Sequence, residues 1–457
     1  MSTSQLVWTA GVFGFLLIAK RTAGWASAFA GAYLLSLCGI PIDLFSIGGT
    51  SNHIGVASSA PAISLGDVFL AAAVLAIWST GVRLKVGWLL AVFLVPSLIF
   101  LLAVWGNTPE QWSGIKLYAT ALLAFGVGRW LSGTLSDESA LVVVCACLIV
   151  CAVQFTVAFA QLQGVTVIDV GSAGESWISG GRMVGIHSHP AILGRNIFLL
   201  FCFLLPLTAY PQRRIRTFAY CAIAIGFFAV LLTLSRANSV AIVSAIVLWV
   251  IFNRRADTLL AKISVIAFGG AAIAANSAVI SELQDRQAAD PSGGYRGRFM
   301  EVALDRIQEE PLTGVGPNSY VQVVGQYDIY SATGFPVHNV FLYSIVETGL
   351  IVTAILFWPI FITLRAAFGQ IIRGERPNSS SAALLSVLPG IFVIASTGWG
   401  LLTFYSLPLW FIGFGFLAAT NEPSDPTKNK VKCSEQDAID CRRQLGRNSE
   451  SRRRSDV

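Results

Sequence analysis

The chain has 457 residues, of which 54% are hydrophobic and 12% charged, and its formal net charge is +6. Its mean hydropathy is +0.67, whereas a soluble domain of this size needs far more polar residues to cover its surface. The composition therefore excludes an ordinary soluble enzyme. It indicates an all-α, polytopic integral membrane protein.

Apolar runs of about 18 or more residues recur along most of the chain, and each is long enough to cross a bilayer as a helix. In lipid the backbone must satisfy its own hydrogen bonds, so these runs are expected to be helices rather than open sheet. The first two runs are short and flank Lys20 and Arg21, so the total is 12 or 13 transmembrane helices. The predicted spans are 6–19, 25–40, 62–80, 86–105, 115–131, 140–160, 192–210, 217–234, 239–252, 262–280, 338–364, 381–399 and 401–420.

The spans and the polar stretches between them predict six regions. Basic loops stay cytoplasmic, and most of the 31 Lys and Arg residues fall on one side if the longest polar stretch is external. That stretch is then periplasmic, and the polar C-terminal tail is a disordered cytoplasmic segment. The regions are N-terminal helices 1–160, an external loop 161–191, helices 192–280, a large periplasmic loop 281–337, C-terminal helices 338–420 and the tail 421–457.

The large loop contains a pattern typical of an amphipathic helix. Its apolar residues recur at spacings of three and four, with charged residues between them. The helix is expected to have Arg298 at its N-terminal end and to stop at Glu310, because Pro311 follows. We expect it to lie along the outer membrane surface. Its apolar stripe consists of Phe299, Val302, Ala303 and Ile307.

Three ionisable residues stand at or within apolar spans. Arg236 lies at the outer end of one span, where an arginine can also simply reach the interface. His338 is expected in the first turn of the helix that follows the large loop. Glu347 lies deeper in that helix, so it is protonated, paired with an arginine or facing a wet cavity.

These residues stand in an ordered set of motifs. Thr233-Leu234-Ser235-Arg236 ends a span, and the segment from Arg298 leads into Glu310-Pro311-Leu312-Thr313-Gly314-Val315-Gly316. His338-Asn339 and Glu347-Thr348-Gly349-Leu350 follow. Over roughly residues 230–350 the set resembles the O-antigen ligase and Wzy-type polymerase family, and His189-Pro190 adds a weaker match in the other external loop.

The resemblance implies transfer of a glycan from a polyprenyl-pyrophosphate carrier to an acceptor hydroxyl. Arginines suit the departing pyrophosphate because their planar fork binds phosphate oxygens bidentately. A histidine suits removal of the acceptor proton because its pKa lies close to neutrality. The expected catalytic residues are His338, Arg236 and Arg298. The expected substrate-binding residues are Arg195, Arg296, Glu347 and His189.

The resemblance also implies partners and a location. The partners are the carrier-linked donor, the lipid bilayer and an acceptor that is lipid A core or growing polysaccharide, with no nucleic acid. The location is the bacterial inner membrane, with the site facing the periplasm. The sequence leaves open whether the chain is a ligase or a polymerase.

No cofactor is expected. The sequence has no Asp-x-Asp pair of the kind that holds a metal around sugar-nucleotide phosphates, and no glycine-rich ATP loop. We therefore expect a metal-independent reaction that excess chelator leaves unchanged.

Two other functions fit a polytopic chain. One is a transferase that uses a polyprenyl-monophosphate sugar and an acidic residue in the first external loop, where this chain has Asp43. The other is a transporter or flippase of lipid-linked sugars, although the halves of the chain show no self-similarity of the kind common in transporters.

Overall fold

The structure is a computed structural model that describes residues 3–39, 43–46, 62–82, 84, 86–253, 295–332, 336–375 and 377–418. Helices dominate these residues, and the only strands among them, β1 (Asp43–Ser46) and β2 (Ala62–Ser64), pair antiparallel. The all-α prediction is confirmed, apart from this short hairpin. The predicted span 262–280 and the tail 421–457 lie outside the described residues, as do positions 281–294 and 333–335 of the large loop.

Every predicted span except 262–280 coincides with a helix, and the first two both fall within α1, whose backbone leaves the helical region at Gly24. The helices that coincide with these predicted spans are α1 (Thr3–Cys38), α2 (Leu65–Ser79), α3 (Gly87–Ala103), α4 (Pro109–Gly133), α5 (Asp137–Leu162), α7 (Pro190–Leu207), α8 (Arg213–Leu232), α9 (Arg236–Phe252), α15 (Val340–Ile372), α16 (Ser379–Thr397) and α17 (Ser406–Ala418). The loops carry α6 (Gly171–Ser179), α12 (Arg296–Glu309), α13 (Tyr320–Val324), α14 (Ile329–Ala332) and the 3-10 turn η2 (Gly400–Leu402).

Length and composition of the helices fit a multi-pass membrane protein. Among the described residues, six helices are long and apolar enough to cross a membrane, namely α1, α5, α7, α8, α15 and α16. Four shorter apolar helices, α2, α3, α9 and α17, accompany them. The polytopic membrane class is thus confirmed, while the total of 12 or 13 crossings stays a prediction.

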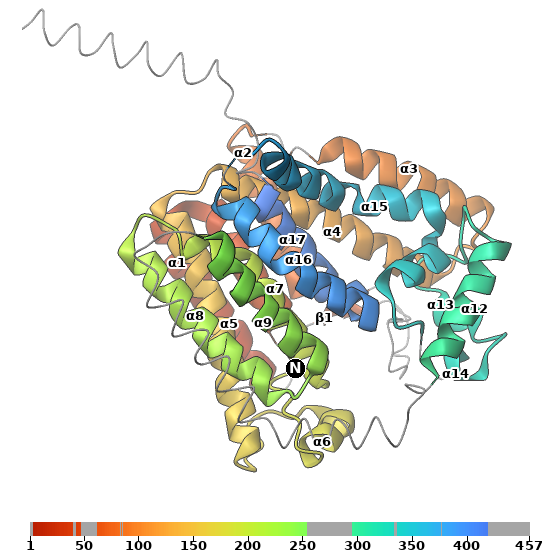
Figure 1. Ribbon diagram of the computed structural model, residues 1–457, viewed down its shortest axis with the longest axis horizontal. Helices are drawn as coiled ribbons and strands as arrows, with labels where there is room; N and C mark the ends of the chain where they lie inside the picture. The colour runs from red at the N-terminus through yellow and green to blue at the C-terminus, as the bar shows by residue number, and fades with distance from the viewer. Residues whose placement is uncertain are drawn as a thin grey trace, which may run out of the picture. The chain divides into compact units, whose positions relative to one another are not determined.

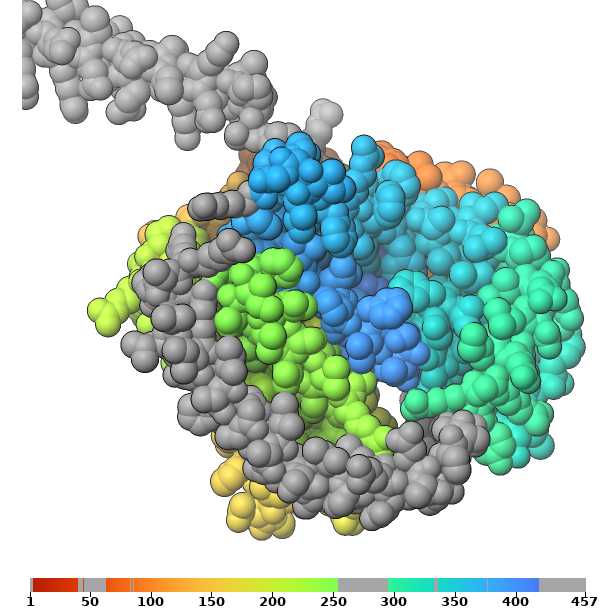
Figure 2. Space-filling view, in the orientation of Figure 1, coloured from red at the N-terminus to blue at the C-terminus, as the bar shows by residue number. Residues whose placement is uncertain are grey.

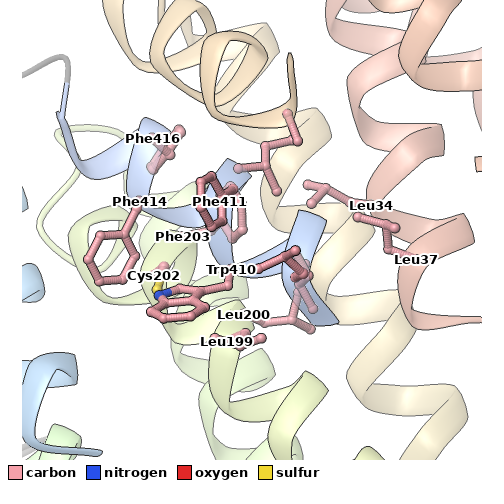
Figure 3. Packing of buried hydrophobic residues seen from close by; sticks show 14 of the residues in the cluster. Leu34, Leu37, Leu199, Leu200, Cys202, Phe203, Trp410, Phe411, Phe414 and Phe416 are labelled. Atoms are coloured by element: carbon pink, nitrogen blue, oxygen red, sulfur yellow. The ribbon is translucent and has the colours of Figure 1, made fainter. Parts of the chain in front are cut away.

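The core forms where α17 packs against α4 and α7 (Figures 1 and 3). Aromatic side chains of α17 fill this core, and the rings of Phe416 and Phe203 lie 5.1 Å apart. On the α4 side, a Cβ atom added to Gly415 would lie 2.1 Å from the carbonyl oxygen of Phe125. Such a close helix approach is possible only with a small residue, as is common in membrane helices.

Helix α15 is interrupted at Gly349, where φ is +68° and ψ is 174°. The interruption exposes backbone groups that the loop after α12 takes up. The N–H groups of Val315 and Gly316 donate to the carbonyls of Val346 and Glu347, at 2.9 and 2.7 Å. On the other side of the break the N–H of Leu350 donates to a loop carbonyl at 2.9 Å. The broken helix and the loop therefore satisfy each other's hydrogen bonds.

The same loop is held from its other side by the start of α4. The indole N–H of Trp105 donates to the carbonyl of Thr313 at 2.9 Å, and the side-chain amide of Asn318 donates to the carbonyl of Glu110 at 3.2 Å. The chain turns sharply here, because Gly314 has a φ of +67°. The turn is thus clamped between α4 and α15.

Replacing Gly349 by alanine is expected to destabilise the protein. The alanine would adopt a strained backbone conformation, and its Cβ would lie 2.1 Å from the carbonyl oxygen of Leu312. We expect a loss of at least about 2 kcal/mol, measured as a lower thermal unfolding midpoint of the purified chain. The control is Gly11→Ala in α1, where a Cβ meets nothing within 4 Å. Equal midpoints for the two variants would contradict the explanation of the break.

Candidate functional site

The loop 182–189, which precedes α7, is anchored to α5 by two buried glutamines. The side-chain oxygen of Gln161 accepts hydrogen bonds from two successive loop N–H groups at 3.1 and 2.9 Å. The side-chain oxygen of Gln154 accepts one from the N–H of Ile186 at 3.2 Å. Because these amides take up the loop's backbone groups, the loop is fixed at one end of the helix bundle.

His187 is buried in this loop as a neutral ring. The amide oxygen of Gln154 is occupied by the backbone, so its amide nitrogen faces Nε2 of His187 at 3.0 Å. Nε2 must therefore accept a hydrogen bond, which places the proton on Nδ1. Burial, and then the charge of Arg195, lower the pKa of His187 to about 3.

His189 was predicted as a loop histidine that contacts substrate, and the structure gives it a capping role. Its Nδ1 accepts a hydrogen bond from the N–H of Ala191 at 3.0 Å and so caps the start of α7. Its ring meets the edge of Trp177 of α6, with centroids 4.8 Å apart. Burial, and then the charges of Arg182 and Arg195, lower its pKa to about 4. Its contact with substrate stays a prediction.

Arg195 is a buried cation in the second turn of α7, with 6% of its surface exposed. Its Nε donates to the hydroxyl of Ser406 at 2.9 Å, and that hydroxyl donates to the side-chain oxygen of Asn196 at 3.0 Å. Within the described ranges no carboxylate forms an ion pair with Arg195. A buried charge without a counter-ion is costly, so the arrangement favours an anion from outside the chain.

Arg236 begins α9 and is exposed. It follows a sharp turn in which Leu234 has a φ of +50°, a conformation that leucine rarely adopts. The side-chain amide of Asn238 donates to the carbonyl of Ala191 at 3.1 Å and to the hydroxyl of Ser235 at 3.0 Å. These bonds hold the N-terminal ends of α7 and α9 side by side. The partial positive charges of the two helix ends add to the charge of the arginines.

Arg182 lies close to the N-terminal ends of α7 and α9. Its Nε donates to the carbonyl of Thr233 at 3.3 Å, and its guanidinium lies 4.7 Å from the ring of Trp177. We call Arg182, Arg195 and Arg236, with the first turns of α7 and α9, the cationic group.

A second group lies in the outer helical segment, residues 295–332, which contains α12, α13 and α14 and forms the right-hand surface in Figure 2. The predicted amphipathic helix is confirmed as α12, which begins at Arg296 and ends at Glu309. The side chain of Phe299, on its apolar face, is buried. Arg298 lies in its first turn and donates from Nε to the carboxylate of Asp328 at 2.6 Å. Its guanidinium lies 5.2 Å from the ring of Tyr330.

His338 was expected in the first turn of the next helix, and this was wrong by two residues. α15 begins at Val340 because the side-chain oxygen of Asn339 caps it, accepting from two backbone N–H groups at 3.0 and 3.1 Å. The ring of His338 stacks on Phe299 of α12, with centroids 6.0 Å apart and planes at 14°. Burial, and then the charge of Arg296, lower the pKa of His338, so the ring is neutral at pH 7.

Glu347 finds hydroxyl and backbone partners in the described structure rather than an arginine. The hydroxyls of Tyr343 and Tyr118 donate to its carboxylate at 2.7 and 3.1 Å, and the N–H of Tyr320 donates at 3.2 Å. With 1% of its surface exposed, Glu347 ties α4, α13 and α15 together. Its role toward substrate stays a prediction.

Apart from Glu347, the predicted site residues thus fall into two groups. Arg296, Arg298 and His338 meet at α12, while Arg195, His189 and Arg236 meet at the ends of α7 and α9. The contacts above hold each group together, and the meeting of the two groups around one substrate stays a prediction.

The sequence-based prediction missed several residues that build these groups. Gln154 and Gln161 are seven residues apart in an apolar span and therefore share one helix face, a signal that could have identified them. Arg182 carried no motif, and Asp328 lies 30 residues from its partner Arg298, a separation that no local pattern reveals.

Residues 221–357 match a family model described as O-antigen ligase. The match confirms the predicted resemblance to the O-antigen ligase and Wzy-type polymerase family, and it includes Arg236, Arg298, His338 and Glu347. A search of curated proteins found no match. The match and the helices together support a multi-pass membrane protein that carries out glycan transfer of the O-antigen ligase or polymerase type.

Proposed function

We propose that the chain transfers a glycan from a polyprenyl-pyrophosphate carrier to an acceptor hydroxyl at the periplasmic face of a bacterial inner membrane. The observation that carries this proposal is the buried Arg195, which has no carboxylate partner among the described residues and lies beside two helix N-termini. Guanidinium groups and helix N-termini both bind phosphate oxygens. The cationic group therefore suits a diphosphate.

The leaving group explains the need for several cations. The bond between the anomeric carbon and the diphosphate breaks, so negative charge grows on the departing oxygen. Preorganised positive charge at that oxygen is commonly the largest catalytic contribution. Arg236 and Arg298 are the proposed catalytic cations, and Arg195 and Arg296 bind the remaining phosphate oxygens. The reaction needs no metal ion in this arrangement.

His338 is the proposed general base. The acceptor oxygen attacks the anomeric carbon, its proton passes to a ring nitrogen of His338, and the carrier diphosphate leaves with the bonding electrons. A base must be neutral to accept the proton, and the lowered pKa of His338 keeps it neutral at pH 7.

Transfer by the purified full chain in proteoliposomes tests the function. The donor is a polyprenyl-pyrophosphate-linked glycan with a labelled sugar, and the acceptor is lipid A core. We expect new glycosidic product that excess chelator leaves unchanged, and at least about a 100-fold loss of rate for His338→Ala, because a general base is removed. Asp43→Asn is the control and should retain activity.

Three results would contradict the proposal. Movement of the donor across the bilayer without a new bond would indicate a transporter. Loss of activity in Asp43→Asn with full activity in His338→Ala would indicate a monophosphate-dependent transferase. Loss of turnover in chelator would refute the metal-independent reaction.

The pH dependence of transfer tests the base directly. The neutral ring is the active form, so the rate should fall as the pH falls through the lowered pKa of His338. In Arg296→Gln one cause of the lowering is absent, so the pKa rises and the acid limb moves to higher pH. Arg306→Gln, which removes a charge from the same helix but not one that lowers this pKa, should leave the limb in place. An unmoved limb in Arg296→Gln would contradict the role of His338.

A further inference from the structure

Asp328 is a buried carboxylate in the outer helical segment, and none of its side chain is exposed. One oxygen accepts from Nε of Arg298 at 2.6 Å. The other accepts from the N–H and the hydroxyl of Ser331 at 2.9 and 3.0 Å. Both oxygens are therefore occupied, and the carboxylate is fixed in orientation by the start of α14.

The contact with Asp328 determines which edge of Arg298 can bind an anion. A guanidinium offers two forks to a phosphate, one from Nε and one Nη, and one from the two Nη groups. Asp328 occupies Nε, and the ring of Tyr330 lies 5.2 Å from the guanidinium carbon. The side chain of Arg298 is still 51% exposed. The fork formed by the two Nη groups is therefore the one left for a ligand.

The aromatic ring that the guanidinium of Arg298 contacts is also held in place. Tyr330 stacks on Tyr295, with ring centroids 4.0 Å apart and planes at 25°. A long side chain held by a fixed carboxylate and a stacked ring loses less rotamer freedom when it binds a ligand. The contacts thus preorganise Arg298.

We propose that Asp328 is a positioning residue that presents the Nη fork of Arg298 to the carrier diphosphate. This proposal rests on the proposed function, since it assigns the anion that Arg298 receives. Asp328 itself touches no substrate and acts only through Arg298. Burial acts to raise its pKa, but the hydrogen bonds from Ser331 and Arg298 outweigh burial and hold the pKa below its usual range. The carboxylate is therefore ionised at pH 7 and can maintain its ion pair with Arg298.

A purely structural ion pair would join α12 to α14 without affecting ligand binding. The same helix provides a matched control, because Arg306 pairs with Glu309 and stacks on Tyr327 at 3.8 Å. Glu309→Gln removes an arginine–carboxylate pair on the same helix, away from the proposed site. A purely structural role predicts an unchanged affinity for pyrophosphate when either pair is removed. A positioning role predicts a weaker affinity for Asp328→Asn alone.

Titration of inorganic pyrophosphate into the purified full chain in nanodiscs tests the proposal. We expect Asp328→Asn to weaken binding roughly tenfold, as loss of an orienting partner commonly does. Arg298→Ala should weaken it similarly, and the double variant should be no weaker than Arg298→Ala, because Asp328 acts through that arginine. Glu309→Gln should bind like the wild type, and Asp328→Glu should bind better than Asp328→Asn.

Thermal midpoints of all variants are measured in parallel. If Asp328→Asn does not fold, Ser331→Ala provides the test, since it loosens the carboxylate and keeps its charge. A weakened affinity at an unchanged midpoint supports the proposal, and an unchanged affinity overturns it.

Other results of these experiments would distinguish a failure of the positioning role from a failure of the proposed function. Additive losses in the double variant, an equal loss in Glu309→Gln, or no pyrophosphate binding by the wild type would overturn the positioning role. Normal pyrophosphate binding with the expected pattern, but without any glycan transfer by the wild type, would remove the proposed function and leave Asp328 as a positioning residue for an anion site.

Discussion

Inside the apolar part of this chain, every backbone polar group and every charge needs a partner within the protein, because lipid offers none. The structure meets this requirement at several unusual places. The break in α15 at Gly349 is closed by the loop after α12, and Gln154 and Gln161 satisfy the backbone of the loop 182–189. Glu347 is surrounded by hydroxyl and N–H donors. Arg195 differs, because no carboxylate among the described residues balances its charge.

The requirement also explains how distant motifs reach one place. The turn after α12 is fixed to α15 by backbone hydrogen bonds, and His338 packs on Phe299. The arginine-bearing first turn of α12 and the histidine before α15 are therefore parts of one rigid arrangement. The capped starts of α7 and α9 form the other arrangement, in which arginines and helix ends combine. In our proposal, the diphosphate is the ligand that joins the two.

Much of the fold could be predicted from the sequence, since apolar runs and a terminating proline are local signals. The spans that lie within the described residues and α12 were predicted in this way, and α12 ends one residue before the expected stop at Glu310. Features that depend on tertiary contacts were not found. The break at Gly349 needs the loop after α12 as its partner, and the sequence alone presents that glycine as part of an apolar helix. The start of α15 lies two residues after the expected one because the side chain of Asn339 caps the helix.

The candidate site was predicted in part, for a similar reason. Arginine and histidine motifs identify chemistry by residue type, so Arg236, Arg298 and His338 stood out, and the family match covers all three. The partners that orient them are recognisable only when the chain is folded. Asp328 contacts Arg298 across the outer helical segment. Gln154 contacts His187 although it precedes that residue by 33 positions and lies in a different element, α5.

In the proposed mechanism, the two arginine groups and His338 surround one departing diphosphate. The most direct measurement is an electron cryo-microscopy map of the full chain in nanodiscs with a non-cleavable phosphonate analogue of the carrier-linked donor. We expect phosphate density within hydrogen-bonding distance of both Arg236 and Arg298, with the anomeric carbon facing His338. Density that contacts neither arginine, or arginines that lie on opposite sides of the bilayer, would contradict it.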